Sequence, residues 1–115
     1  MQIFTLPIAA ILFIAVVSAH AEQISGRELL AYCIDGEPRT HKTYCDGYIT
    51  AAIETHATWA LWNRLQRVFC FPKGDKFTHA YGTVIAYLRA HPKELDFEAS
   101  SLVLNALNQA FPCDE

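Results

Sequence analysis

The sequence has no surplus of basic residues. It contains 9 Lys and Arg against 12 Asp and Glu among 115 residues, and its formal net charge is −3. Because proteins hold nucleic acid largely through basic groups that neutralise phosphates, we expect no nucleic-acid partner. Charged residues are few, at 18%, whereas hydrophobic residues make up 52%. This composition excludes intrinsic disorder, and the length fits one folded domain.

The usual signatures of catalytic and metal sites are also missing. Neither Gly-x-Ser-x-Gly nor His-Glu-x-x-His occurs, so the common serine hydrolases and zinc peptidases are not indicated. Glu54 and His56 are close in sequence, but on a helix they would lie about 200° apart and could not face one substrate. The cysteines and histidines do not have the spacing of metal ligands. We therefore expect a protein without catalytic residues, metal or cofactor.

The first 21 residues contain no Lys, Arg, Asp or Glu. Within them, Ile8–Val17 is an unbroken apolar run, shorter than the roughly 20 residues with which a helix crosses a bilayer. The small residues Ala19 and Ala21 occupy the positions that a signal peptidase recognises. We predict a signal peptide cleaved after Ala21. Because no Lys or Arg precedes Ile8, an uncleaved anchor or a buried core helix is the alternative.

The cysteine content agrees with export. All four cysteines fall within residues 22–115, the predicted mature domain. An even number of cysteines in a small exported domain predicts disulfides, each of which stabilises such a fold by about 2–4 kcal/mol. We therefore predict two disulfides, formed by Cys33, Cys45, Cys70 and Cys113.

The predicted mature domain begins with residues that favour the start of a helix. Ser25 and Glu28 form a capping box, in which each side chain can bind a free backbone N–H of the first helical turn. The helix should run over about Gly26–Ile34, because Asp35–Pro38 contains a glycine and a proline that end it.

A second helix is predicted from Thr43, because apolar residues recur there at intervals of three and four. This helix bends or restarts near Trp62-Asn63. Its apolar face consists of Tyr44, Tyr48, Ile49, Ala52, Ile53, His56 and Ala60.

Two further helices complete the prediction. The third has about 15 residues and ends at Ala90, because His91-Pro92 disfavours its continuation. Asp96 is predicted to cap the fourth, which ends before Pro112. The fold class is thus all-α, a small disulfide-bonded bundle of four to five helices. The inward residues are Phe77, Tyr81, Val84, Ile85 and Leu88 in the third helix and Ala99, Leu102, Val103, Ala106, Leu107 and Ala110 in the fourth.

Helix geometry favours one of the three possible disulfide pairings. On a mostly continuous helix Cys45 and Cys70 would stand up to about 37 Å apart, whereas bridged α-carbons lie within about 7 Å. The third and fourth helices should pack antiparallel, which returns Cys113 to the neighbourhood of Cys70. We therefore predict the pairs Cys33–Cys45 and Cys70–Cys113.

Two stretches are candidates for binding a partner, because their residues are the least typical of the helical framework that holds the fold together. The first is the loop 35–43, in which Asp35 and Glu37, together with Asp46 beyond it, could meet a basic partner.

The second stretch is 58–69, with Trp62, Arg64 and Arg67. We expect Trp62 to be an interface anchor and Trp59 to be core, because Trp59 continues the inner face that carries His56. The alternative for the charged residues of both stretches is that they form an ordinary solvent-exposed face and bind no partner.

Several short motifs, spread over the whole predicted mature domain, occur in a characteristic order. They are Gly26-x-x-Leu29-x-x-x-Cys33, Cys45-Asp46-Gly47-Tyr48-Ile49, Cys70-Phe71-Pro72, Tyr87-Leu88-x-x-His91-Pro92, Ala99-Ser100-x-Leu102-Val103-x-x-Ala106-Leu107 and Phe111-Pro112-Cys113. In this order and with these cysteines, the chain resembles the Rap/Tai-type immunity proteins of bacterial type VI secretion.

The resemblance implies a function without catalysis. Proteins of this family are small, helical, disulfide-bonded and periplasmic, are often homodimers, and neutralise peptidoglycan amidase effectors. We therefore expect a periplasmic immunity protein that binds and blocks such an amidase. The alternative is a periplasmic acid-stress chaperone of the Hde type, because the histidines and carboxylates would change charge in acid.

Overall fold

The computed structural model describes residues 22–34, 40–74 and 78–114. These residues form four α-helices and one short 3₁₀-helix, and no strand is present among them, which confirms the all-α prediction. The helices are α1 (Gly26–Ile34), α2 (Thr40–Leu61), α3 (Thr78–Ala90) and α4 (Ala99–Ala110), with the 3₁₀-helix η1 (Pro92–Glu94) between α3 and α4.

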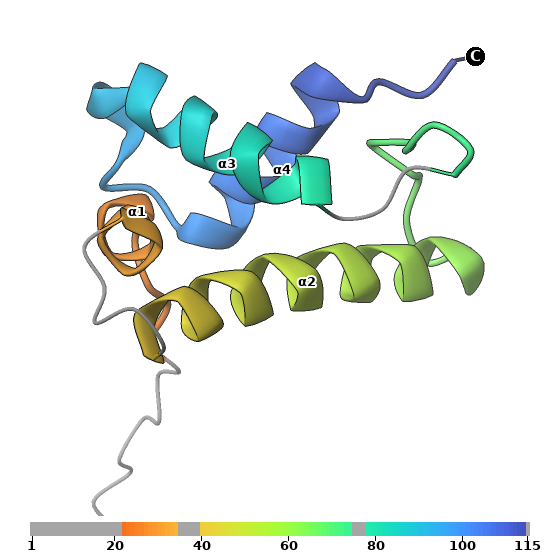
Figure 1. Cartoon of the computed structure of the whole chain (residues 1–115). Helices are drawn as coiled ribbons and strands as arrows, with labels where there is room; N and C mark the ends of the chain where they lie inside the picture. Colours follow the sequence, from red (N-terminus) through yellow and green to blue (C-terminus); the bar gives the residue numbers. More distant parts are fainter. Residues whose placement is uncertain (1–21, 35–39, 75–77, 115) are drawn as a thin grey trace, which may run out of the picture.

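The long helix α2 forms the base of the molecule (Figure 1). Helix α1 crosses it near its beginning, and α3 and α4 pack together above it. Helix α4 runs back toward the end of the molecule at which α3 begins. The far end of α2 extends beyond α3 and α4, and the following chain folds back over it.

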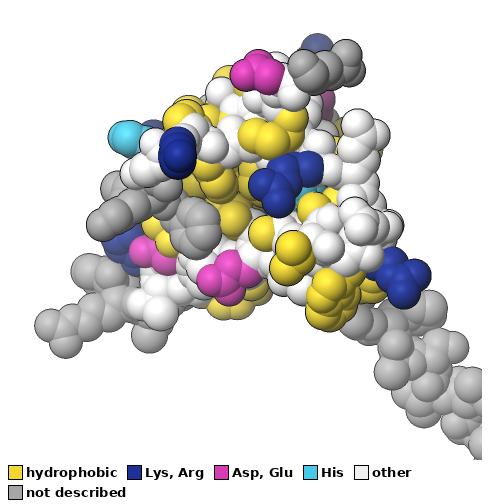
Figure 2. Space-filling model, turned by 90° about the vertical axis from the view of Figure 1, so that its right-hand side faces the viewer, with side chains coloured by type: hydrophobic (Ala, Val, Ile, Leu, Met, Phe, Trp, Pro, Cys, Tyr) yellow, Lys and Arg dark blue, Asp and Glu magenta, His cyan; other side chains and the backbone are white. Residues whose placement is uncertain are grey.

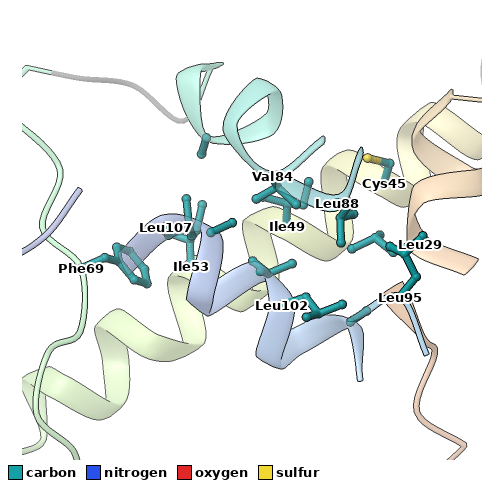
Figure 3. Packing of buried hydrophobic residues seen from close by; sticks show 14 residues of the cluster. Leu29, Cys45, Ile49, Ile53, Phe69, Val84, Leu88, Leu95, Leu102 and Leu107 are labelled. Atoms are coloured by element: carbon teal, nitrogen blue, oxygen red, sulfur yellow. The ribbon is translucent and has the colours of Figure 1, made fainter. Parts of the chain in front are cut away.

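The hydrophobic core is a row of side chains between the four helices (Figure 3). It extends from Leu29 and Leu95 at the α1 end to Phe69 at the other. Removal of this apolar surface from water is the main stabilising contribution to the fold. Its largest fully buried members are Leu29, Cys45, Ile49, Val84, Leu88, Leu102, Val103 and Leu107.

Helix α1 begins and ends where the sequence predicts. The Ser25 backbone N–H donates to Glu28 Oε2 at 2.8 Å, and the Glu28 N–H donates to Ser25 Oγ at 3.2 Å, which confirms the capping box. The chain before α1 also pairs with the chain before α4, because Gly26 N–H donates to the Phe97 carbonyl at 2.9 Å and Ala99 N–H donates to the Ile24 carbonyl at 2.9 Å.

The ends of α2 differ from the prediction. The helix begins at Thr40, three residues before Thr43, and it ends at Leu61. Asn63 has a positive φ of 55°, and its N–H donates to the Ala60 carbonyl while Arg64 N–H donates to the Trp59 carbonyl. These two bonds form a Schellman cap, so α2 ends just before Trp62-Asn63 and does not bend or restart there as predicted.

The prediction that Asp96 caps α4 is wrong. The N-cap residue is Glu98, and it makes no side-chain cap hydrogen bond. Asp96 is exposed and instead accepts from Arg27 Nη2 at 3.2 Å. The start of α4 is set by the backbone pairing with Ile24, which local sequence signals do not reveal. Ala110 is also exposed, although its spacing placed it inward.

Both predicted disulfides are present. The α-carbons of Cys33 and Cys45 lie 5.1 Å apart, and those of Cys70 and Cys113 lie 4.9 Å apart. The first bridge joins α1 to α2, and the second joins the chain after α2 to the chain after α4. The Cys70–Cys113 pairing follows from the return of α4, as predicted.

The predicted signal peptide, residues 1–21, lies outside the described residues. Within the ranges that the structure describes, no helix has the length and apolar character needed to cross a membrane.

Candidate partner-binding surface

The far end of α2 exposes large apolar side chains. Leu61 is 76% exposed, Trp62 60% and Trp59 45%. The two indole rings meet edge to face, with centroids 6.0 Å apart. The expectation that Trp59 is core is wrong, because α2 extends beyond the helices that cover its inner face (Figure 1). Trp62 is accessible, as an interface anchor must be.

Residues 62–68, which we term the crossing segment, lead from the end of α2 back across that helix. At Val68 the segment is held from both sides. The Val68 N–H donates to His56 Nε2 of α2 at 3.2 Å, and Asn108 Nδ2 of α4 donates to the Val68 carbonyl. Immediately afterwards, Cys70 N–H donates to the Phe111 carbonyl at 2.8 Å. The segment therefore has fixed anchors on α2, α4 and the C-terminal chain.

His56 is buried beneath this segment, as its place on the apolar face predicts. Only 5% of the residue is exposed, and its ring stacks on Phe69 with centroids 4.4 Å apart. Burial, with a smaller contribution from the positive charge of Arg67, lowers the pKa of His56 from its ordinary value of 6.5. A neutral imidazole is therefore the stable form in the fold.

An apolar groove of about 370 Å³ lies beside the crossing segment, between α2 and α4. Trp59 and Leu65 form part of its wall, so the groove and the exposed end of α2 are continuous. None of the described residues that line it is Asp, Glu, Lys or Arg. The lining residues are Tyr48, Ala51, Ala52, Thr55, His56, Trp59, Leu65, Ser100 and Leu104.

Basic side chains flank the apolar surface. Arg64 and Arg67 are exposed on the crossing segment, and neither forms an ion pair with another described residue. Figure 2 shows this end of the molecule, where Lys and Arg side chains lie among exposed hydrophobic ones. The predicted residues Trp62, Arg64 and Arg67, which are close in sequence, are all exposed in the structure.

The acidic candidates belong to the other predicted stretch of the chain. Asp35 and Glu37 lie outside the described residues. Asp46 pairs with Lys42 one turn earlier on α2, at 3.0 Å, which partly neutralises its charge.

Sequence patterns did not single out Leu61, Leu65 or Asn108 as contributors to this surface. One available signal was Asn63, because asparagine tolerates the left-handed conformation that ends a helix and would have marked Leu61 as terminal. No local signal indicates that Asn108 reaches Val68, which is 40 residues away in the chain.

The described residues contain no group of three or more His, Cys, Asp and Glu that could hold a metal ion. The exposed side chains of the candidate surface are apolar at the end of α2 and cationic at Arg64 and Arg67, which suits contact with another molecule. The family model of the Rap1a immunity proteins matches residues 25–113.

The chain belongs to the Rap1a immunity protein family. The match begins at the capping serine of α1 and ends at the last cysteine, so it includes all four helices and both disulfides. This confirms the resemblance found in the motifs. No curated protein and no solved structure matches the chain. The Rap1a family indicates an immunity protein directed against a secreted effector, and the disulfides are consistent with an exported protein.

Proposed function

We propose that this protein is a periplasmic immunity protein that binds and blocks a peptidoglycan amidase delivered by type VI secretion. The family supports binding to an effector. The observation that carries the choice of surface is the exposed end of α2, where Leu61 and Trp62 are 76% and 60% exposed. Tryptophan in such a position is the residue type most enriched among dominant interface contacts.

Inhibition of this kind requires contact and no chemistry of the inhibitor's own. The crossing segment projects from a rigid base, because Val68 is fixed to α2 and α4 and Cys70 is linked to Cys113. A segment that is ordered before binding loses little conformational entropy when it enters a cleft. A folded, non-catalytic protein can therefore occupy an enzyme's substrate cleft tightly.

The charges indicate the chemistry of the complementary surface. Arg64 and Arg67 have no acidic partner among the described residues, and the adjoining groove is apolar and uncharged. An effector surface with apolar side chains and neighbouring carboxylates fits this arrangement, since guanidinium groups pair well with carboxylates. These contacts would add specificity and speed of association.

The test uses a purified peptidoglycan amidase effector of type VI secretion and measures its hydrolysis of peptidoglycan. Wild-type protein should inhibit the amidase at equal molar amounts. Trp62→Ala should keep its fold but weaken binding by about 2 kcal/mol, roughly thirtyfold in Kd. Phe97→Ala is the matched control, because Phe97 is also 60% exposed but lies before α4; it should inhibit like wild type.

Equal loss of inhibition in both variants, or none in either, would remove the end of α2 from the binding surface. Suppression of client aggregation in acid without inhibition of the amidase would favour the chaperone alternative instead. Light scattering of the free protein and of the complex will show whether the functional unit is a homodimer.

A further inference from the structure

The crossing segment depends on very few contacts for its position. Its first turn is fixed by the cap of α2, in which Arg64 N–H donates to the Trp59 carbonyl at 2.9 Å. Within the described chain, the backbone of residues 65–67 makes no hydrogen bond before Val68 is reached. The placement of Leu65 and Arg67 therefore depends on what holds Val68.

His56 holds the N–H side of Val68, and it can do so in only one charge state. The acceptor is Nε2, 3.2 Å from the Val68 nitrogen. A ring nitrogen accepts a hydrogen bond only when it carries no proton, so this contact requires a neutral imidazole protonated at Nδ1. Asn108 donates to the Val68 carbonyl, so its hydrogen bond does not supply an acceptor for the Val68 N–H.

We propose that His56 is a positioning residue for the partner-binding surface, and that uptake of one proton at its Nε2 releases the crossing segment from α2. Protonation would place an N–H of the imidazolium against the N–H of Val68, so two donors would face each other with no acceptor between them. The assignment of this segment to effector binding rests on the proposed function, whereas the release itself does not.

The surroundings of His56 set the direction of the pH effect. Arg67 of the crossing segment and Glu54 of α2 line the same hollow as His56, and the nearby groups of α4, Ser100, Leu104 and Asn108, are uncharged. Burial and then Arg67 lower the pKa of His56. The stability that comes from the neutral ring is therefore complete above pH 6.5 and is lost as the pH falls through the lowered pKa.

The first arm of the test needs no effector. In ¹⁵N-labelled protein titrated from about pH 8 to about pH 4.5, the His56 ring titrates below its ordinary pKa. The Val68 amide and Trp62 indole signals should move with the same midpoint. His56→Gln should abolish this shared transition, because the glutamine oxygen can still accept from Val68 but does not titrate in this range.

Two further variants keep the test decisive if His56→Gln fails to fold. Arg67→Gln changes only an exposed side chain and removes a positive charge beside the ring, so the shared midpoint should rise. His79→Gln replaces an exposed histidine of α3 and should leave the midpoint unchanged. Val68 and Trp62 signals that stay fixed while His56 titrates, or an unchanged midpoint in Arg67→Gln, would overturn the proposal.

The second arm measures affinity for the amidase effector used above, at about pH 7.5 and about pH 5. Loss of one such hydrogen bond should weaken wild-type binding roughly tenfold in acid, whereas His56→Gln should change by less than about twofold. An equal acid effect in both proteins would contradict control by His56. An amidase that binds at neither pH, with the shared transition intact, would reject the proposed function and retain the positioning role of His56.

Discussion

A single missing side chain determines how closely α1 approaches its neighbours. Gly26 is buried at the start of α1. A Cβ at this position would overlap the side chain of Leu102 and would lie 3.4 Å from both a methyl group of Leu88 and the carbonyl oxygen of Leu95. The glycine is needed for close packing, because these neighbours belong to the core and the backbone.

We expect Gly26→Ala to lower the free energy of unfolding by about 1–3 kcal/mol, because overpacking forces the core to shift. Urea unfolding will measure the change. Gly82→Ala is the control, since Gly82 is an exposed residue of α3 with open space around the added methyl; it should stabilise the protein by up to about 1 kcal/mol. A Gly26→Ala protein as stable as wild type would show that α1 moves aside without cost.

At the scale of elements, the end of α2 determines where the candidate partner-binding surface lies. Asn63 adopts a left-handed backbone conformation with φ 55°, which most residues with a Cβ adopt only at a cost of about 1–2 kcal/mol. We expect Asn63→Val to lower stability by that amount and to weaken effector binding. Asn63→Gly should stay within about 0.5 kcal/mol of wild type, because glycine adopts this conformation freely.

Urea unfolding and amidase inhibition, measured on both Asn63 variants, test this cap. Equal stability of the valine and glycine proteins would mean that the left-handed residue does not determine the end of α2.

Helix limits were predictable where the sequence itself marks them. The capping box and the glycine and proline that follow α1 gave both of its ends correctly. The end of α2 is marked less clearly in the sequence, because apolar residues continue from Leu61 to Val68 as they would in a helix. The start of α4 was assigned wrongly to Asp96, since the true determinant is pairing with Ile24, which is distant in sequence.

The same distinction explains the candidate surface. Periodicity places Trp59 and His56 on one face of α2, but it does not say how far α3 and α4 extend along that face. His56 is covered by the crossing segment, whereas Trp59 is 45% exposed because it lies beyond the segments that cover this face of α2. Prediction from sequence therefore placed both residues on one face of α2 and misjudged the accessibility of Trp59.

At the scale of the whole molecule, the two disulfides should contribute unequally to stability. The loop closed by Cys70–Cys113 spans 43 residues and that closed by Cys33–Cys45 spans 12. Loop-closure entropy then predicts losses of about 4 and about 3 kcal/mol when each pair is changed to serine.

The two double variants should also differ in where order is lost. Removal of Cys70–Cys113 should broaden the NMR signals of Trp62 and Val68, because this bridge anchors the crossing segment. Removal of Cys33–Cys45 should leave those signals sharp. The reverse pattern would show that the C-terminal chain does not hold the segment in place.

Both tryptophans of the chain lie at the end of α2, within 6.0 Å of each other. Tryptophan fluorescence, excited at wavelengths that tyrosine does not absorb, therefore reports on this end of the molecule alone, whereas circular dichroism reports on all the helices. Unfolding curves recorded by fluorescence and by circular dichroism compare the stability of the α2 end with that of the whole helical fold. Coincident curves would mean that the projecting end and the core melt as one cooperative unit, and an earlier fluorescence change would mean that the end opens first.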